Sequence, residues 1–423
     1  MNPFSRPARI WTPPLALAVL SVGILSCGGG SSPTLRIGAV FPLTGAQAAL
    51  GRQELEGVKL AAQLANRAGG VDGRPIELEV KNLTSQSQAG PTVAALKSTG
   101  ASIVMGAYSS LLSIPVATAA AQAGLVYWET GAVADHLTGH ASPLVFRVGA
   151  SGGNLGTNSA NFAASVLAPR LGLPAERTRV SVVFENDAYG QSVAGAAVRT
   201  VGADGMQLVL DRAYDAYRPD WGQVMSAVVA SRPDILILAS YIPDGVAFRR
   251  AMLADHVQVG AMIGSTMAEC GPDFGNELGP QAVGVFASDR PEGDFNPSAL
   301  DPTGKRDFHA LATAWKQATG QASPTEEALS GFSAAWALFH DVLPHAAASL
   351  TPSAVAAAAR AVDLPLGELP NGAGLRFATG ADLGQNLRAA AVIWQWQAPR
   401  HSVVVWPAVY ATGGVRLVPL PAS

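Results

Sequence analysis

Hydroxyl-bearing residues gather in short loops, each of which follows an apolar run and precedes a helical pattern. The loops are residues 42–45, 106–110, 129–132, 185–190, 240–244 and 265–269. Hydroxyls combined with the free backbone N–H groups of a helix start suit an anion such as a carboxylate. An alternative for Ser109 and Ser110 is that they only cap the helix that follows them. These loops therefore predict a site for a small polar solute.

We assign no catalytic or metal-binding motif to this sequence. We assign no nucleophile elbow, phosphate-binding loop or His-Glu-x-x-His motif, and the glycine cluster at 149–153 is interpreted as none of these. His136 and His140 have the spacing of metal ligands on a helix, but no third ligand lies nearby in the sequence. We interpret them as a solvated surface pair, and we expect no metal and no cofactor.

The elements that must position these loops alternate between strand and helix. Strands are predicted at 35–41, 76–80, 102–105, 125–128, 180–184, 206–210, 234–239, 261–263 and 283–286, with helical spacing between most of them. The tail predicts helices at 308–318, 330–343 and 353–361, and strands at 375–377, 390–396 and 403–405. Such alternation is typical of parallel sheets covered by helices on both faces. Since ligands bind beyond the carboxyl ends of such strands, the loops above are the ones to examine.

The first 33 residues predict export. Arg6 and Arg9 precede an apolar run at 15–25, which is too short to span a bilayer, and this order is typical of a signal peptide. The segment ending at Cys27 resembles a bacterial lipobox, so residues 1–26 are predicted to be removed and Cys27 to carry lipid. Residues 27–33 then form a flexible tether. The alternative is an ordinary signal peptide in which Cys27 is incidental.

Composition limits the remaining possibilities. The chain has 423 residues, a formal net charge of −3 and 48% hydrophobic residues, which is enough for two lobes with their own cores. No basic stripe is present, which argues against nucleic acid as a partner. With Cys27 lipidated, Cys270 would be unpaired, and we expect it to be a buried, inert thiol.

These features together resemble the branched-chain amino-acid type (leucine/isoleucine/valine-binding) solute-binding proteins of ABC importers. The resemblance rests on residues 37–45, 66–75, 106–110, 145–147, 187–191 and the loop of Tyr241. It implies an α/β fold of two doubly wound parallel-sheet lobes joined by three crossovers, the type 1 periplasmic-binding fold. We assign residues 34–150 and 290–388 to lobe 1, and residues 151–289 and 389–423 to lobe 2. The resemblance further implies a monomer that delivers its ligand to a membrane permease without catalysis.

The same resemblance assigns ligand-binding roles, residue by residue. It places the carboxylate-binding serine at Ser110, a backbone contact near Gly131 and the tyrosine of the second lobe at Tyr241, with Tyr189 also facing the cleft. Ser109 stands where the leucine-binding members have a cysteine.

At two positions this sequence differs from the residues that the resemblance leads us to expect, and both differences bear on which ligand is bound. Val133 replaces an expected threonine, and Thr266 replaces the acid that holds the ligand's ammonium group, with Glu269 and Glu129 as candidate substitutes. An amino acid, an amide and a small carboxylate all remain open as ligands.

The sequence thus predicts a lipid-anchored, extracytoplasmic substrate-binding protein on the outer side of a bacterial membrane. Two alternatives stay open. One is a ligand sensor of the same fold that does not serve transport, and the other is an α/β hydrolase.

Overall fold

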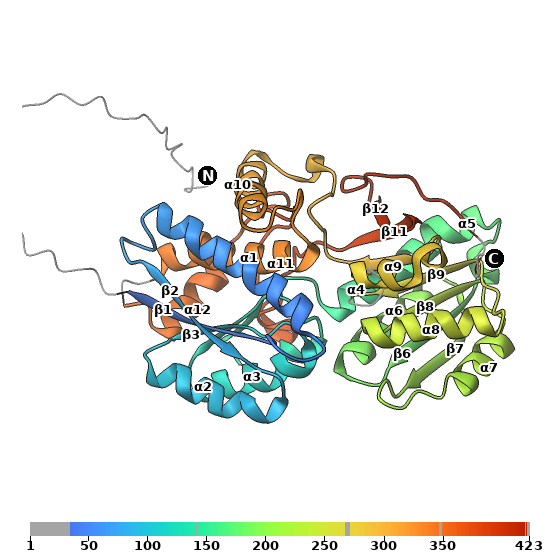
Figure 1. Cartoon of the computed structure of the whole chain (residues 1–423), viewed down its shortest axis with the longest axis horizontal. Coiled ribbons are helices and arrows are strands. Elements are labelled where there is room, and N and C mark those ends of the chain that lie inside the picture. The colour runs from blue at the N-terminus through green and yellow to red at the C-terminus, as the bar shows by residue number, and fades with distance from the viewer. Residues whose placement is uncertain (1–33, 140–141, 267–270, 347–348, 419, 421–423) are drawn as a thin grey trace, which may run out of the picture.

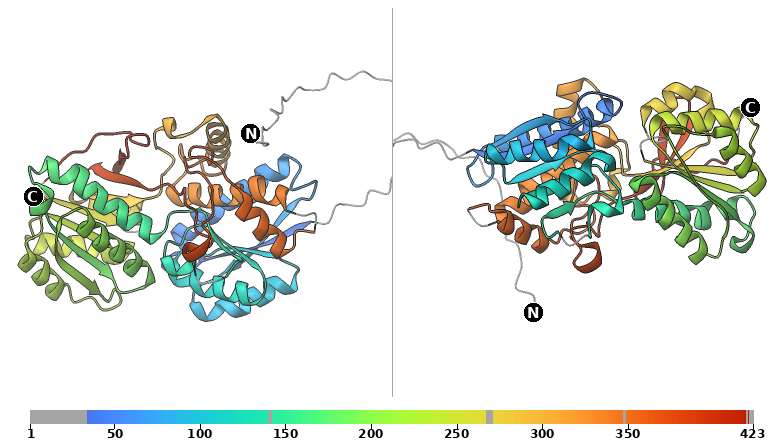
Figure 2. Two further views of the ribbon diagram at one scale, coloured as in Figure 1. Left: turned by 180° about the vertical axis from the view of Figure 1, so that it is seen from behind. Right: turned by 90° about the horizontal axis from the view of Figure 1, so that it is seen from below.

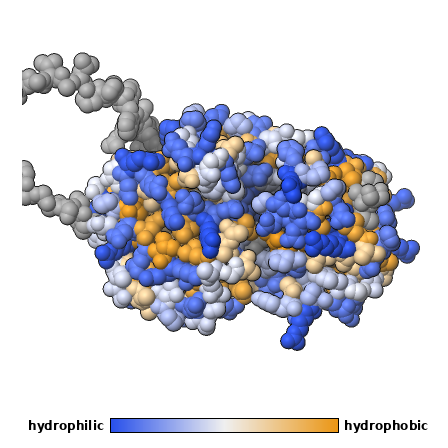
Figure 3. Space-filling view, viewed as in Figure 1, coloured by the Kyte–Doolittle hydropathy of each residue, from blue (hydrophilic) through white to orange (hydrophobic). Residues whose placement is uncertain are grey.

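A computed structural model describes residues 34–139, 142–266, 271–346, 349–418 and 420. The chain forms two lobes that lie side by side, each built on one β-sheet with helices on its faces (Figure 1). Figure 2 shows the same separation from behind and from below. On the face seen in Figure 3, hydrophilic residues cover most of both lobes, and one apolar patch gathers on the lobe that contains the N-terminal strands.

Lobe 1 contains a five-stranded sheet of parallel strands in the order β2-β1-β3-β4-β5. Its strands are β1 (Leu35–Phe41), β2 (Ile76–Asn82), β3 (Ile103–Gly106), β4 (Val126–Glu129) and β5 (Val145–Arg147). Helices α2 (Ala89–Ser98) and α3 (Ser110–Gln122) pack on one face of the sheet. The other face carries α1 (Ala48–Arg67) and three helices from late in the chain: α10 (Pro302–Thr319), α11 (Glu326–Trp336) and α12 (Pro352–Ala361).

Helices α1 and α11 approach so closely that glycine is required at the contact. A Cβ atom added at Gly57 would lie 2.0 Å from the carbonyl oxygen of Ala328, and one added at Gly331 would lie 2.2 Å from that of Glu54. Contacts this short would force the helices apart. The two glycines therefore fix the position of α1, and with it the buried carboxyl group of Glu54.

Lobe 2 contains a seven-stranded sheet in the order β12-β11-β10-β9-β8-β6-β7. Strands β6 (Arg179–Glu185), β7 (Gln207–Tyr214), β8 (Ile235–Ala239), β9 (Ala261–Ser265) and β10 (Phe286–Asp289) are parallel, whereas β11 (Val392–Ala398) and β12 (His401–Trp406) pair antiparallel at one edge. Its helices are α4 (Gly152–Phe162), α5 (Ala168–Arg170), α6 (Ala188–Ala203), α7 (Trp221–Ser231), α8 (Ile242–Ala254) and α9 (Pro272–Leu278).

The chain passes between the two lobes three times. It leaves lobe 1 between β5 and α4, returns between β10 and α10, and crosses again before β11. Late helices thus complete lobe 1, and the last two strands complete the sheet of lobe 2. The prediction of two parallel-sheet lobes joined by three crossovers is confirmed.

Some predicted elements differ from the structure. The strand predicted at 375–377 does not form; instead, isolated bridges join Leu364 to Leu375 and Phe377 to Asn386. Helices α4 and α9 were not predicted. Helix α4 begins with the glycine cluster, where a Cβ added at Gly156 would lie 2.0 Å from the carbonyl oxygen of Val193 in α6. Close packing on α6 thus stabilises a helix that its glycines disfavour.

The predicted signal peptide, the predicted lipidation site Cys27, and residues His140, Glu269 and Cys270 lie outside the described residues. Within the part of the chain that the structure describes, no helix has the length and apolar character needed to cross a membrane.

Candidate functional site

Six of the eight predicted ligand-binding residues line one small cavity between the lobes, which we call the inner cavity. Its lining residues are Tyr108, Ser110, Gly131, Ala132, Val133, Tyr189, Tyr241, Thr266 and Arg290. Every one of them follows a strand, as the rule for open α/β sheets requires. The cavity volume is about 10 Å³, which is room for about one water molecule. A larger solute can occupy this site only if the lobes move apart.

The first residues of α3 bring Ser110 to the cavity. Its hydroxyl oxygen accepts a 3.0 Å hydrogen bond from the backbone N–H of Ala134. Ser109, the residue before α3, does not line the cavity, and its hydroxyl donates to Oε1 of Gln47 at 2.8 Å. Neither hydroxyl caps α3, so the capping interpretation is wrong. The first N–H groups of a helix lack acceptors in a preceding turn, and Ser110, the first residue of α3, lines the cavity.

The loop after β4 is held by Glu129. One oxygen of its buried carboxylate accepts hydrogen bonds from the backbone N–H groups of Thr130, Gly131 and Ala132, at 2.8 to 2.9 Å. The other oxygen accepts from the hydroxyl of Tyr127 at 2.8 Å. Glu129 is thus fully used in shaping the loop, and the structure gives it this role in place of gripping a ligand's ammonium group.

Arg290 is a cavity residue that the sequence analysis missed. It follows β10 and is 5% exposed. Its Nε lies 2.5 Å from a carboxylate oxygen of Glu326 and 3.5 Å from one of Asp289. Its Nη1 donates to the carbonyl of Gly131 at 2.8 Å and to the hydroxyl of Ser330 at 3.0 Å. Burial lowers the pKa of Arg290, but the charges of Glu326 and Asp289 outweigh that effect and raise it, so the guanidinium stays charged.

Two tyrosines form the lobe 2 wall of the inner cavity. The Tyr189 hydroxyl donates to the carbonyls of Ser240 and Ser265, at 3.2 and 2.5 Å. The Tyr241 hydroxyl donates to Oδ2 of Asp187 at 2.9 Å, and the two tyrosine rings lie 5.0 Å apart. This wall is therefore held in place before any solute binds.

Val133 and Thr266, the two residues that differ from the expected family pattern, both line the cavity. Thr266 is 3% exposed, its backbone has the positive φ of 42°, and its hydroxyl has no hydrogen-bond partner among the described residues. Such a buried, unpaired hydroxyl is costly unless a ligand or water bonds to it. Val133 packs with Leu155 and Tyr189, so it presents an apolar surface where a hydroxyl was expected.

A group of buried carboxyl groups lies behind the cavity. Burial, followed by the charge of Glu129, raises the pKa of Glu54 to about 8. A Cβ added at Gly131 would lie 2.2 Å from Oε2 of Glu54, so this carboxyl group lies directly against the cavity loop. Burial also raises the pKa of Glu327 to about 7. A single buried cation, Arg290, offsets these charges among the described residues nearby.

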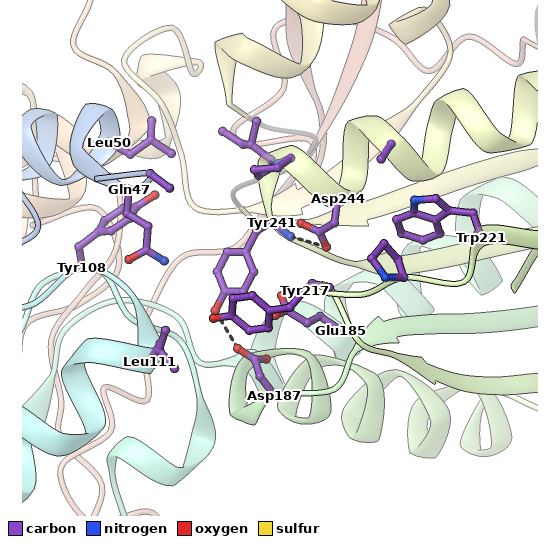
Figure 4. A pocket seen from close by; sticks show the side chains of 16 residues that line it. Gln47, Leu50, Tyr108, Leu111, Glu185, Asp187, Tyr217, Trp221, Tyr241 and Asp244 are labelled. Carbon is purple, nitrogen blue, oxygen red and sulfur yellow. Dashed lines mark hydrogen bonds between the residues drawn. The ribbon is translucent and has the colours of Figure 1, made fainter. Parts of the chain in front are cut away.

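A second, larger cavity of about 410 Å³ lies next to the inner one, and we call it the outer cavity (Figure 4). Gln47, Leu50, Tyr108 and Leu111 lie on its lobe 1 side, and residues of the loops after β6, β7 and β8 face them from lobe 2. Tyr108 and Tyr241 line both cavities. The two cavities are therefore neighbours that share two wall residues.

The interpretation of residues 149–153 needs a correction, because their letters do match Gly-x-Ser-x-Gly. In the structure Ser151 precedes α4 as its N-cap: its oxygen accepts from the backbone N–H of Asn154 at 3.0 Å. Its hydroxyl donates to the Asn154 side chain at 3.1 Å, not to a histidine. A nucleophile needs an adjacent base, so Ser151 has a structural role.

A family model described as periplasmic binding protein matches residues 34–396. This chain belongs to the periplasmic binding protein family. Leu/Ile/Val-binding protein homolog 8 of Brucella abortus (strain 2308) is 27% identical over 384 residues, which cover 90% of this chain and 93% of that protein.

Solved structures of periplasmic binding proteins share the fold. The substrate binding protein of a branched-chain amino acid transporter from Streptococcus pneumoniae, in complex with isoleucine, has a TM-score of 0.70 at 18% identity and covers 88% of this chain and 100% of its own. A periplasmic binding protein type 1 from Bordetella pertussis Tohama I has a TM-score of 0.70 at 18% identity and covers 92% and 100%. The predicted family and type 1 fold are confirmed.

Of the residues in and behind the cavity of this periplasmic binding protein that the sequence did not predict, Tyr108 and Arg290 had a usable signal and Glu54 had none. Tyr108 lies inside a loop that was singled out for its serines. Arg290 follows the last parallel strand, and applying the strand-end rule to that strand would have indicated it. Glu54 had no such signal, because it lies within a helix whose packing partner is more than 270 residues away in the sequence.

Proposed function

We propose that this protein is the extracytoplasmic substrate-binding protein of an ABC importer, and that it closes two lobes around a small polar solute. Lobe 1 comprises residues 34–150 and 290–388, and lobe 2 comprises residues 151–289 and 389–423. The solute is an amino acid, an amide or a small carboxylate. Family membership supports this role, as does the likeness to the transporter substrate binding protein from Streptococcus pneumoniae.

The observation that carries the proposal is the inner cavity itself. It encloses the start of α3 from lobe 1 and the unpaired hydroxyl of Thr266 from lobe 2. A polar solute offers partners to both when the lobes close, and these contacts replace its hydration shell. A solute that bridges both lobes shifts the population toward the closed form.

We further propose that the chain is anchored by lipid on Cys27 to the outer side of a bacterial membrane, where it meets a permease. The anchor is tested separately from binding. Cells expressing the full chain are grown with a radiolabelled fatty acid, and we expect label on the wild type and none on Cys27→Ala. Equal label on both proteins would contradict the anchor and leave solute binding untouched.

Solute binding is tested by thermal shift over amino acids, amides and small carboxylates. A ligand at 100 to 1,000 times its dissociation constant adds about 3 to 4 kcal/mol to the free energy of unfolding, which is readily detected. We expect Ser110→Ala and Tyr241→Ala to weaken binding of each hit at least tenfold.

The matched control is Ser181→Ala, which removes a buried serine that hydrogen-bonds Ser231 within lobe 2, away from both cavities. Ser110→Ala and Ser181→Ala each lose one buried hydrogen bond, so each costs about 1 kcal/mol. Equal affinity of wild type and Ser110→Ala would contradict the assignment of the inner cavity. Turnover of any bound amide or ester would contradict a purely binding role.

A further inference from the structure

The outer cavity is negatively charged on its lobe 2 side. Glu185, Asp187 and Asp244 all line it, and its lining contains no lysine, arginine or histidine among the described residues. Figure 4 shows the three carboxylates around Tyr241, opposite the apolar side chains of lobe 1. Carboxylates grouped without a cation repel one another, and their burial is costly.

Two of these carboxylates have structural partners. Asp187 accepts from the backbone N–H of Gly190 at 2.7 Å and from the hydroxyl of Tyr241 at 2.9 Å. Asp244 accepts from the hydroxyl of Tyr214 and from the backbone N–H of Tyr241. Both residues therefore hold the starts of α6 and α8 in place.

Glu185 has no such role. It is the last residue of β6 and is 7% exposed, and its Oε2 is fully buried without a hydrogen-bond donor among the described residues. Burial, followed by the charges of Asp187, Asp244 and Asp215, raises the pKa of Glu185 to about 8. A buried carboxyl group that lines a cavity and lacks a donor points to a missing cationic or donor partner.

The rest of the lining suits an organic cation. Tyr217 and Trp221 line the same side as Glu185, and Tyr108, Leu50 and Leu111 lie across from them. Aromatic faces attract ammonium groups, and the apolar side chains suit a hydrocarbon body. The described residues contain no group of three side chains that could hold a metal ion, so the chemistry favours an amine.

From these contacts we infer that the outer cavity is a subsite for the protonated amine of a solute with an apolar body, with Glu185 as its counter-ion. The inference rests on the proposed function and names the solute class more closely. It also accounts for Thr266: the ammonium group is not held at the inner cavity, where an acid was expected, but by Glu185 in the adjacent space. The carboxylates of Asp187 and Asp244 attract the same ammonium group from a greater distance.

The test uses matched compounds that differ only in their polar end. One set is 2-phenylethylamine, 2-phenylethanol and 3-phenylpropanoate, and the other is isopentylamine, isopentanol and 4-methylpentanoate. Thermal shift and calorimetric titration are measured at pH 8.5 on the wild type, Glu185→Gln and Glu176→Gln. Glu176 is exposed on lobe 2 away from both cavities, so its variant makes the same chemical change without touching the subsite.

We expect at least one amine to bind more tightly than its alcohol and carboxylate counterparts. Its dissociation constant should rise at least tenfold in Glu185→Gln and stay within twofold in Glu176→Gln. Amines that bind no better than their counterparts, or whose affinity survives Glu185→Gln, overturn the inference.

The failure of the inference and that of the proposed function are distinguishable. Binding of a carboxylate or amide that Ser110→Ala weakens and Glu185→Gln leaves unchanged keeps the proposed function and overturns the amine subsite. Absence of any shift over both sets and over the wider panel of amino acids, amides and carboxylates overturns both. Folding of Glu185→Gln is checked by its melting temperature without solute at pH 6, below the pKa of about 8 of Glu185. It should not fall there, because the neutral amide mimics the protonated carboxyl group.

Discussion

Nη1 of Arg290, the residue after β10, donates a 2.8 Å hydrogen bond to the carbonyl of Gly131, in the loop after β4 of the other sheet. The same guanidinium contacts Glu326 in α11. One buried cation thus links the second crossover, the cavity loop and a late helix of lobe 1.

Arg290→Met should lower the free energy of unfolding by about 3 to 5 kcal/mol, because it leaves the buried carboxylates of Asp289 and Glu326 without their cation. Chemical unfolding of the variant measures this loss. The double variant Arg290→Met with Glu326→Gln should recover part of it. Arg218→Met, at an exposed position, is the control and should have little effect. Similar losses in both single variants would contradict the structural role of Arg290.

Gly131→Ala should cost about 1 to 3 kcal/mol, because the new Cβ would lie 2.2 Å from Oε2 of Glu54. In a Glu54→Ala background the same substitution should cost less, since the obstructing carboxyl group is gone. The coupling is measured by a double-mutant cycle in urea. Gly90→Ala, where no atom lies within 4 Å of the added Cβ, should be close to neutral. Additive effects of the two substitutions would refute the contact.

The raised pKa of Glu54, about 8 in the folded protein, predicts a pH dependence of stability. The folded state holds a proton that the unfolded state releases near pH 4.5, so the contribution of Glu54 to stability is lost as pH rises from about 5 to about 8. The slope is at most about 1.4 kcal/mol per pH unit. Wild type and Glu54→Gln are compared by unfolding at each pH, and the difference between them should favour the variant increasingly up to about pH 8. A constant difference would mean that Glu54 is ionised when folded.

Glu129→Ala should be severely destabilising, by more than about 3 kcal/mol, because three backbone N–H groups of the cavity loop lose their acceptor together. Glu129→Gln retains one oxygen and should cost less. Urea unfolding of the two variants, with Glu176→Ala as an exposed control, tests this order. If Glu129→Ala were as stable as the control, Glu129 would not be what holds the loop after β4 in place.

Much of the site was accessible from the sequence, because strand ends in a parallel sheet meet at one edge. That rule selected the loops that contain Ser110, Tyr189, Tyr241 and Thr266, and the family resemblance singled out these residues within them. All four lie around one cavity. Their roles in ligand binding stay predictions. The buried ion pairs could not be predicted from the sequence. The pairing of Arg290 with Glu326 depends on how α11 packs, and no local sequence pattern indicates that packing.

Helices and strands with a strong hydrophobic periodicity were predicted correctly. Elements that form only because of their tertiary packing were missed. Helix α12 (Pro352–Ala361) covers its predicted range of 353–361. Helix α4 was missed because its glycines and polar residues are typical of a loop, and only its contact with α6 makes glycine favourable there.

The order of strands in lobe 2 also bears on how the protein is made. Strands β11 and β12 lie beside β10 in the sheet, yet β10 ends at Asp289 and β11 begins only at Val392. Lobe 1 likewise needs α10, α11 and α12 to cover one face of its sheet. Neither lobe can therefore be completed until the residues of the other lobe that interrupt it have been synthesised. A nascent chain of this kind stays incompletely folded until its last elements are made, which would favour the export that we propose for this protein.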